Sequence, residues 1–210
     1  FEAGLKVWWQ AVTEPDAVAA IKLTLFVLVI VVPLNAVFGV AIAWAVAKFE
    51  FRGKTLLVSI IDMPFAISPV VVGLIFVIFF GSHGWLGPWL QQHDIKIIFA
   101  VPGIVIVILF GTLPFVAREL IPLMQQQGKD EEEASLTLGA SGWQTFWRVT
   151  VPLVRPATVT VVTLSLIGGL RSFDLIWAMT RGGPGFSSDV LASVIYKQYQ
   201  AGFYGLATAG

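Results

Sequence analysis

The chain has 210 residues, of which 57% are hydrophobic and 12% are charged, and its mean hydropathy is +0.84. Soluble domains carry about 25% charged residues, so this composition excludes a soluble enzyme and a disordered chain. The formal net charge is zero and cysteine is absent, which excludes a basic nucleic-acid surface, a disulfide framework and a Cys-ligated metal. The sequence predicts an all-α integral membrane protein that contacts a lipid bilayer and no nucleic acid.

Four apolar stretches are long enough to cross a bilayer as helices, which takes about 20 residues each. The predicted spans cover residues 17–47, 55–81, 97–117 and 157–180. Backbone polar groups in lipid must be satisfied within their own segment, which favours helices. We expect a single transmembrane domain over residues 1–210, built as a polytopic helical bundle. We also expect these four spans to be a fragment of a six-span chain.

The connections between the spans differ in their content of basic residues, which favour the cytoplasmic side of a membrane. Residues 48–54 and 118–156 together hold seven Lys and Arg, against four in residues 1–16, 82–96 and 181–200. The sequence therefore predicts that 48–54 and 118–156 face the cytoplasm and that the other three connections face outward.

The second predicted span, residues 55–81, contains two prolines and one acidic residue, Asp62. Proline breaks the hydrogen-bond ladder of a helix, and broken helices in a bilayer line protein or a cavity. We expect this segment to line a translocation pathway, with Ser68 as a polar contact. Asp62 lies deep enough to face the bundle interior. It either belongs to the pathway or accepts hydrogen bonds from Ser59 or from groups freed by Pro64.

The fourth predicted span contains Arg171 and Asp174, whose spacing places both on one face of a continuous helix. Two interpretations remain open. The residues form a structural ion pair, or they line the pathway, where Arg171 attracts an anion or Asp174 binds a sugar hydroxyl. His83 and His93 have no further ligands nearby, so no metal site is predicted there. No G-x-x-x-x-G-K-[ST] motif occurs, so we expect no ATP binding through a P-loop.

Residues 129–156, within the second cytoplasmic segment, predict two short helices joined by a turn. Asp130 and Glu133 have the spacing of a capping box, and acidic residues stabilise a helix N-terminus. Gly139 is typical of the position just after a helix ends. The first helix is therefore predicted over residues 130–138.

The second short helix is predicted to begin with a capping box formed by Ser141 and Gln144 and to end at Pro152. One face of this helix is aromatic. A surface helix with such a face lies on its own bundle or in lipid headgroups, or it docks in a groove of a cytosolic partner. The residues of this face are Trp143, Phe146, Trp147 and Thr150.

The pattern Glu133-Ala134-Ser135-x3-Gly139-x9-Val149-x-Val151-Pro152 resembles the EAA loop of ABC importer permeases, E-A-A-x3-G-x9-I-x-L-P. The three departures from that pattern are mild. The resemblance implies the type I ABC importer permease fold, in which this loop supplies the coupling helices that sit in a cleft of the ATPase subunit. We call residues 118–156 the coupling loop. Its expected ATPase-coupling residues are Glu133, Ala134, Gly139, Trp143, Phe146 and Pro152.

The same resemblance implies a complex in the bacterial inner membrane. A second permease subunit, a cytosolic dimer of ABC ATPases and a periplasmic substrate-binding protein are the expected partners. ATP and Mg would bind to the ATPase, so we expect no cofactor, no metal and no catalytic residue in this chain. An intramembrane enzyme would need a nucleophile–base pair or a metal cluster at membrane depth, and a passive channel would not need an aromatic docking helix.

A closer resemblance covers residues 17–165, which are similar to the W-type subunit of bacterial sulfate/thiosulfate permeases. It is carried by residues 32–54, 62–87 and 114–152. Residues 172–205 instead resemble sugar-importer permeases, which carry F-D-x-I-x-x-M-T-x-G-G-P-G. The resemblance implies transport of a sulfate/thiosulfate-type oxyanion, with sugar or molybdate import as alternatives. The expected pathway residues are Asp62, Ser68, Arg171 and Asp174.

Overall fold

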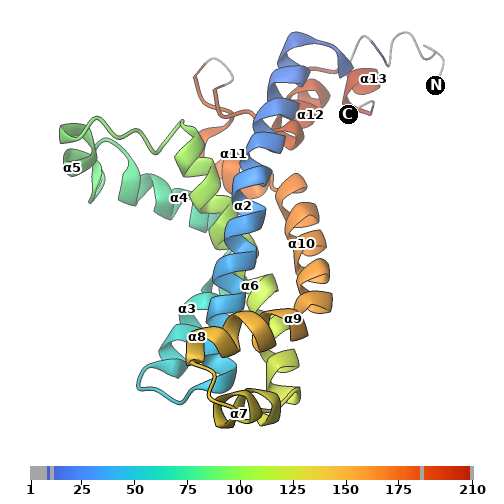
Figure 1. Cartoon of the computed structure of the whole chain (residues 1–210). Helices are drawn as coiled ribbons and strands as arrows, with labels where there is room; N and C mark the ends of the chain where they lie inside the picture. Colours follow the sequence, from blue (N-terminus) through green and yellow to red (C-terminus); the bar gives the residue numbers. More distant parts are fainter. Residues whose placement is uncertain (1–8, 10–11, 185–186, 209–210) are drawn as a thin grey trace. The chain divides into compact units, whose positions relative to one another are not determined.

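The computed structural model describes residues 9, 12–184 and 187–208, and no β-strand occurs among them. Most of the predicted outer segment 1–16 lies outside the described residues. The elements, labelled in Figure 1, are α2 (Pro15–Lys48), α3 (Lys54–Ala66), α4 (Pro69–Phe80), α5 (Gly87–Gln92), α6 (Val101–Gln126), α7 (Asp130–Thr137), α8 (Gly142–Thr145), the π-helix η1 (Phe146–Thr150), α9 (Val151–Leu153), α10 (Arg155–Leu170), α11 (Asp174–Thr180), α12 (Leu191–Gln200) and α13 (Tyr204–Ala207).

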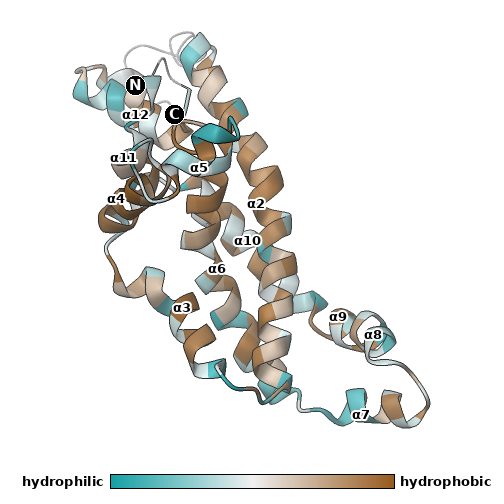
Figure 2. Cartoon of the chain, turned by 90° about the vertical axis from the view of Figure 1, so that its left-hand side faces the viewer, coloured by the Kyte–Doolittle hydropathy of each residue, from teal (hydrophilic) through white to brown (hydrophobic). Residues whose placement is uncertain are grey.

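Two helices, α2 and α6, are each long and apolar enough to cross a membrane. They coincide with the first and third predicted spans, and Figure 2 shows both as mainly hydrophobic. Two further pairs of helices, α3 with α4 and α8–α9 with α10, qualify if each broken pair counts as one span, which gives up to four. Helix α6 continues past the predicted end at residue 117 to Gln126, so Arg118 lies on a helix and not in a loop.

The second and fourth predicted spans are not continuous helices. The chain leaves the helix between α3 and α4 at Ser68, whose ψ of 136° is extended because a residue that precedes proline avoids the helical region. The prediction of one helix over residues 157–180 was wrong, since α10 ends at Leu170 and α11 begins at Asp174. Gly168 and Gly169 at the end of α10 have low helix propensity, which explains this second break.

The chain forms two compact units. Unit 1 comprises residues 1–31, 67–111 and 168–210, and unit 2 comprises residues 32–66 and 112–167. Helices α2, α6 and α10 each contribute residues to both units. The expected single transmembrane domain stays a prediction.

Unit 1 has an apolar core that includes buried Phe76 of α4, Ile104 of α6 and Ile176 of α11. Helices α4 and α11 approach closely at Gly73, where a Cβ atom would lie 2.7 Å from the Cβ of Ala178. Small residues allow this kind of close helix packing, which replaces the hydrophobic driving force that is absent between helices in lipid.

Unit 2 has its own core, formed by the C-terminal parts of α2 and α6 together with the first turns of α10. A Cβ atom at Gly39 of α2 would overlap the side chain of Val116 of α6, so these two helices are in close contact. The buried Asn35 amide donates a hydrogen bond of 2.6 Å to Thr112 Oγ1 across the same helix pair. The buried apolar residues of this core are Ala43, Val116, Leu120, Met124, Val154 and Val161. This packed framework carries helices α7 to α9 of the coupling loop.

Candidate functional site

The first helix of the coupling loop, α7, confirms the helix predicted over residues 130–138 and the turn at Gly139. Gly139 has a φ of +89°, and the backbone N–H groups of Gly139 and Ala140 donate to the carbonyls of Leu136 and Ser135. This is the Schellman pattern that ends a helix with a left-handed residue, a conformation that favours glycine. The capping box predicted at Asp130 was wrong, because Asp130 is the first residue of the helix and Lys129 is its N-cap, without a side-chain cap.

The second capping box is confirmed. The Ser141 N–H donates to Gln144 Oε1 at 2.8 Å, and the Gln144 N–H donates to Ser141 Oγ at 3.3 Å. The helical run that follows does not end at Pro152, as predicted, but continues through Leu153. A π-helical turn precedes the proline, and in it the Val151 N–H donates to the Phe146 carbonyl. The wider turn accommodates a proline that would break a regular α-helix.

The predicted aromatic face divides into a packed part and an exposed part. Phe146 packs against Trp44 of α2, with ring centroids 4.8 Å apart, and Thr150 is buried. The interpretation that the helix lies on its own bundle therefore holds for these two residues. Trp143 and Trp147 remain 69% and 53% exposed. Of the four residues on this face, the two tryptophans are therefore the ones available to a partner.

A buried polar cluster joins the coupling loop to the end of α2. Lys48 Nζ lies 3.5 Å from Glu132 Oε2 and also donates a hydrogen bond to the Gly128 carbonyl. The other carboxylate oxygen, Glu132 Oε1, accepts a hydrogen bond of 2.7 Å from Thr150 Oγ1. The side chains of Lys48 and Glu132 are only 6% and 14% exposed. We call Lys48, the Gly128 carbonyl, Glu132 and Thr150 the anchor cluster.

The anchor cluster connects three elements, α2, α7 and η1, and the hydroxyls of Ser135 and Thr145 connect α7 to α8 with a 2.7 Å hydrogen bond. The sequence patterns did not predict this cluster, because Lys48 was interpreted only as a basic residue of a cytoplasmic connection. The detectable signal was the lysine itself, at the last position of a long apolar helix. A cation favours the C-terminal end of a helix, and a buried one needs a counter-charge.

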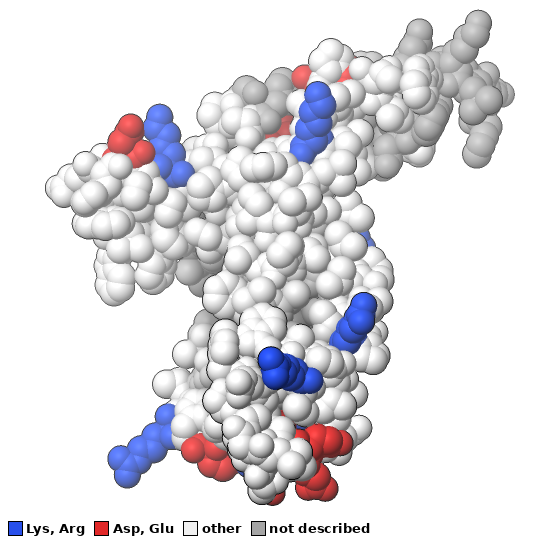
Figure 3. Space-filling view, in the orientation of Figure 1, with Lys and Arg blue, Asp and Glu red and all other residues white. Residues whose placement is uncertain are grey.

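The outer surface of the coupling loop is acidic and apolar. Four consecutive acidic residues, 130–133, form the first turn of α7, and Figure 3 shows Asp and Glu side chains gathered over this helix. Glu133 and Ala134 are exposed, and Leu138 is 89% exposed beside the turn. In the neighbouring connection, the exposed Glu50 accepts a hydrogen bond of 2.7 Å from Lys54, which lowers the pKa of the Glu50 carboxyl.

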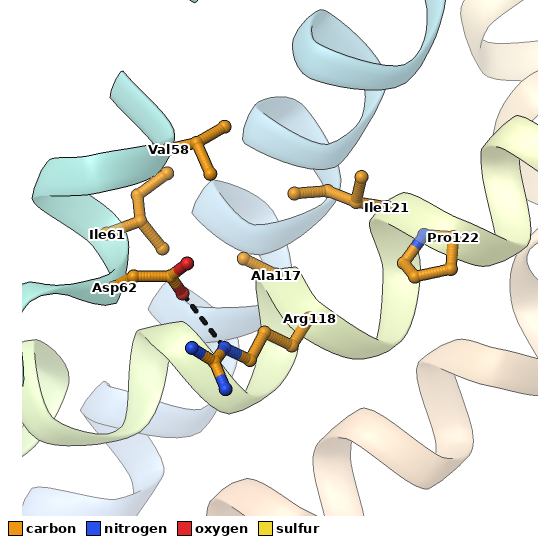
Figure 4. Close-up of a pocket in the computed structure, with 7 residues that line it drawn as sticks. All are labelled: Val58, Ile61, Asp62, Ala117, Arg118, Ile121 and Pro122. Atoms are coloured by element: carbon orange, nitrogen blue, oxygen red, sulfur yellow. Dashed lines mark hydrogen bonds and ion pairs between the residues drawn. The ribbon is translucent and has the colours of Figure 1, made fainter. Parts of the chain in front are cut away.

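A second charged site lies on α3 and α6 within unit 2. Arg118 Nε donates a hydrogen bond of 2.9 Å to Asp62 Oδ1, and the guanidinium lies 4.3 Å from the centre of the Phe65 ring. The partner predicted for Asp62, Ser59 or the backbone near Pro64, was wrong. Arg118 was missed because it was assigned to a loop. The two charged residues border a pocket of about 190 Å³ (Figure 4), lined by Val58, Ile61, Asp62, Ala117, Arg118, Ile121 and Pro122.

The remaining predicted pathway residues lie in unit 1. Ser68 is exposed at the N-cap of α4, and its side chain makes no capping hydrogen bond. Arg171 and Asp174 do not share a helix face, because Arg171 lies in the break before α11, and the described residues contain no ion pair between them. Their roles in transport stay predictions. Among the described residues no group of His, Cys, Asp or Glu could hold a metal ion.

Comparisons with known proteins place these features in a family context. Residues 35–210 match the family described as binding-protein-dependent transport system inner membrane component. The chain is 46% identical to the sulfate transport system permease protein CysW of Synechococcus elongatus over 202 residues, covering 95% of this chain and 71% of the relative. It is 47% identical to CysW of Escherichia coli over 176 residues, which is 84% of this chain and 60% of that relative.

The alignment with the Synechococcus protein covers 95% of this chain, so it includes most of residues 172–205, where the sequence resembles sugar importers. The fold is similar to a bacterial ABC transporter involved in the import of the acidic polysaccharide alginate, with a TM-score of 0.82 and 19% identity over 98% of this chain and 76% of that one. A structure of the alginate transporter in complex with an alginate pentasaccharide-bound periplasmic protein gives a TM-score of 0.81, with 20% identity over 98% and 75% of the two chains.

We predict that the anchor cluster holds α7 to α9 against the rest of unit 2. Lys48→Met leaves a buried carboxylate unpaired and Glu132→Gln leaves a buried ammonium unpaired, which costs about 3–5 kcal/mol of unfolding free energy. Each variant should be cleaved faster by protease within residues 126–154. The double variant should lose less unfolding free energy than the sum of both single variants, because neither charge is then left alone.

Lys54→Met, which breaks an exposed pair, serves as the control and should show no change. If the four variants resist protease as well as the wild type does, the role of the cluster is contradicted.

Proposed function

Because the chain belongs to the family of binding-protein-dependent transport system inner membrane components, we propose that it is the permease subunit of an ABC importer for sulfate and related oxyanions such as thiosulfate. The observation that carries the substrate class is the high identity to sulfate permease subunits along nearly the whole chain. The alignment with the Synechococcus permease covers 95% of this chain and so includes most of residues 172–205, which favours an oxyanion over the sugar alternative. The chain spans 60% of the E. coli relative, and the activity of the whole protein belongs to this proposal.

The proposed complex lies in the bacterial inner membrane and contains a second permease subunit, two cytosolic ATPase subunits and a periplasmic binding protein. ATP and Mg bind to the ATPase subunits, and this chain performs no hydrolysis. The exposed face of the coupling loop supports this arrangement. An acidic first turn on α7 is repelled by the anionic lipids of a cytoplasmic leaflet, so Trp143 and Trp147 fit a protein groove better than a headgroup layer.

Coupling in this proposal runs through contacts within unit 2. Closure of the ATPase dimer displaces α7 to α9, which are connected to one another by Ser135 and Thr145. The anchor cluster passes this displacement to the end of α2, and Phe146 on Trp44 adds a second contact to the same helix. A helix is stiff along its axis, so the movement reaches residues at membrane depth without a local change in α2.

The substrate path in this proposal avoids an uncompensated full charge. A fixed full charge in a low-dielectric site would bind an anion too tightly for release, whereas hydroxyl groups and helix N-termini bind it more weakly. Ser68 fits this demand, because its exposed hydroxyl lies at the N-terminus of α4 and does not cap the helix.

The direct test of the proposed substrate is uptake. We expect cells that depend on this permease, expressed with its cognate ATPase and binding protein, to import labelled sulfate in an ATP-dependent manner. Unlabelled thiosulfate should compete, and maltose-type sugars should not. Sugar uptake without sulfate uptake would contradict the proposal, and a clear preference for molybdate over sulfate would assign the chain to molybdate import instead.

We further predict that Trp143→Ala and Trp147→Ala each weaken association with the ATPase subunit by about 2 kcal/mol or more, the typical cost of truncating a buried aromatic anchor. The measurement is the affinity of detergent-solubilised permease for the purified ATPase. Trp85→Ala and Trp89→Ala remove tryptophans that are also exposed, on the predicted outer side, and should leave the affinity unchanged. Unchanged affinity in the Trp143 and Trp147 variants would mean that these side chains rest in lipid.

A further inference from the structure

The Asp62–Arg118 pair is unusual because both charges are accessible in the interior of helices that each carry only one other charged residue, Lys54 on α3 and Glu119 on α6. The side chain of Arg118 is 58% exposed and that of Asp62 is 37% exposed in unit 2. Asp62 lies about two helical turns from the predicted cytoplasmic edge of its span, at 1.5 Å per residue. Charged side chains at membrane depth face a water-filled cavity or another protein surface and avoid lipid. The accessible face of this pair therefore faces the pathway or a protein neighbour.

The chemistry of the pair favours the pathway and an anion. A guanidinium has five N–H donors in a planar fork that matches the oxygens of a carboxylate or an oxyanion. Only Arg118 Nε is committed, to Asp62, while the terminal nitrogens donate no hydrogen bond within the described part of the chain. One face of the guanidinium rests near the Phe65 ring, which fixes its plane (Figure 4 shows the pair without that ring).

The pocket beside the pair suits a small ligand. Apart from the two charged residues, its lining is apolar, and its volume of about 190 Å³ is below the roughly 300–1,000 Å³ of pockets for drug-sized molecules. A tetrahedral oxyanion has five heavy atoms and fits such a space. A sugar would need several polar partners around its ring, and this pocket offers polar groups only from Asp62 and Arg118.

We propose that Arg118 is an anion-contact residue of the translocation pathway and that Asp62 moderates its affinity. In the resting pair the carboxylate neutralises the guanidinium, so the site attracts an anion without holding it as a lone positive charge would. A passing sulfate accepts hydrogen bonds from the terminal nitrogens of Arg118, and the negative charge of Asp62 weakens its binding. This inference rests on the proposed function, since it requires an anionic substrate.

The first test replaces both charges at once, because a single change would leave one charge uncompensated. Arg118→Gln/Asp62→Asn keeps side chains of similar size and should lower Vmax/KM for sulfate by at least about tenfold, the loss expected when a charge-assisted hydrogen bond is removed. Asp62→Asn alone should lower both KM and Vmax, because an unopposed Arg118 binds the anion more tightly and releases it more slowly. Glu50→Gln/Lys54→Gln removes an exposed pair at the start of the same helix and should leave uptake unchanged.

The second test uses the absence of cysteine from the chain. In the assembled complex, Arg118→Cys should react with water-soluble thiosulfonate reagents, and millimolar sulfate should slow the reaction. Modification with an aminoethyl reagent restores a positive charge and should recover part of the uptake, whereas a sulfonatoethyl reagent should not. Ile60→Cys, exposed on α3 outside the pocket, should show no protection by sulfate.

The outcomes separate this inference from the proposed function. If the wild-type complex imports sulfate but the double variant matches its Vmax/KM, the role of Arg118 is wrong and the proposed function stands. If the double variant fails to assemble, the Arg118→Cys experiment provides the test. The inference is wrong if no aqueous reagent modifies this cysteine, or if sulfate does not slow its modification. A wild-type complex that imports no oxyanion overturns both.

Discussion

A buried lysine at the end of a long apolar helix requires a counter-charge, and in this protein the counter-charge comes from the coupling loop. Lys48 is the last residue of α2, and its ammonium is almost fully removed from water. Separation of the pair would leave an uncompensated charge, which is far more costly than loss of an exposed ion pair. Separation of Glu132 from Lys48 is therefore strongly unfavourable, and this constraint fixes where α7 lies in unit 2.

The other features of the coupling loop follow from this constraint. With α7 held by Glu132, the second carboxylate oxygen is available to Thr150, which fixes the π-helical turn. Phe146 then packs on Trp44, and both Trp143 and Leu138 remain exposed. The loop thus has a polar and aromatic inner face, which packs against its own α2, and an acidic and apolar outer face, which is accessible to the proposed ATPase subunit. Because the two faces differ, this short segment can pack against α2 on one side and contact a second protein on the other, and it can move as one body.

Local patterns predicted the parts of this arrangement that depend on neighbouring residues. The long apolar run of α2, the capping box of Ser141 and the left-handed turn at Gly139 all follow from rules that act within a few residues. Contacts between distant residues were not predictable in this way. Arg118 and Asp62 are 56 residues apart, and their pairing depends on the extension of α6 past the expected membrane edge. The break at Arg171 was missed because apolar composition alone favoured a continuous span.

If the coupling loop and α2 move together as one body, the distance between them stays constant during transport, and this distance can be measured. The chain has no cysteine, so spin labels can be placed uniquely at Leu138→Cys, beside the turn, and Ala41→Cys, exposed on α2. Double electron–electron resonance on the assembled complex would compare the nucleotide-free state with the ATP–vanadate-trapped state. We expect the same distance distribution in both states, and a shift or broadening on trapping would show that the loop moves independently of α2.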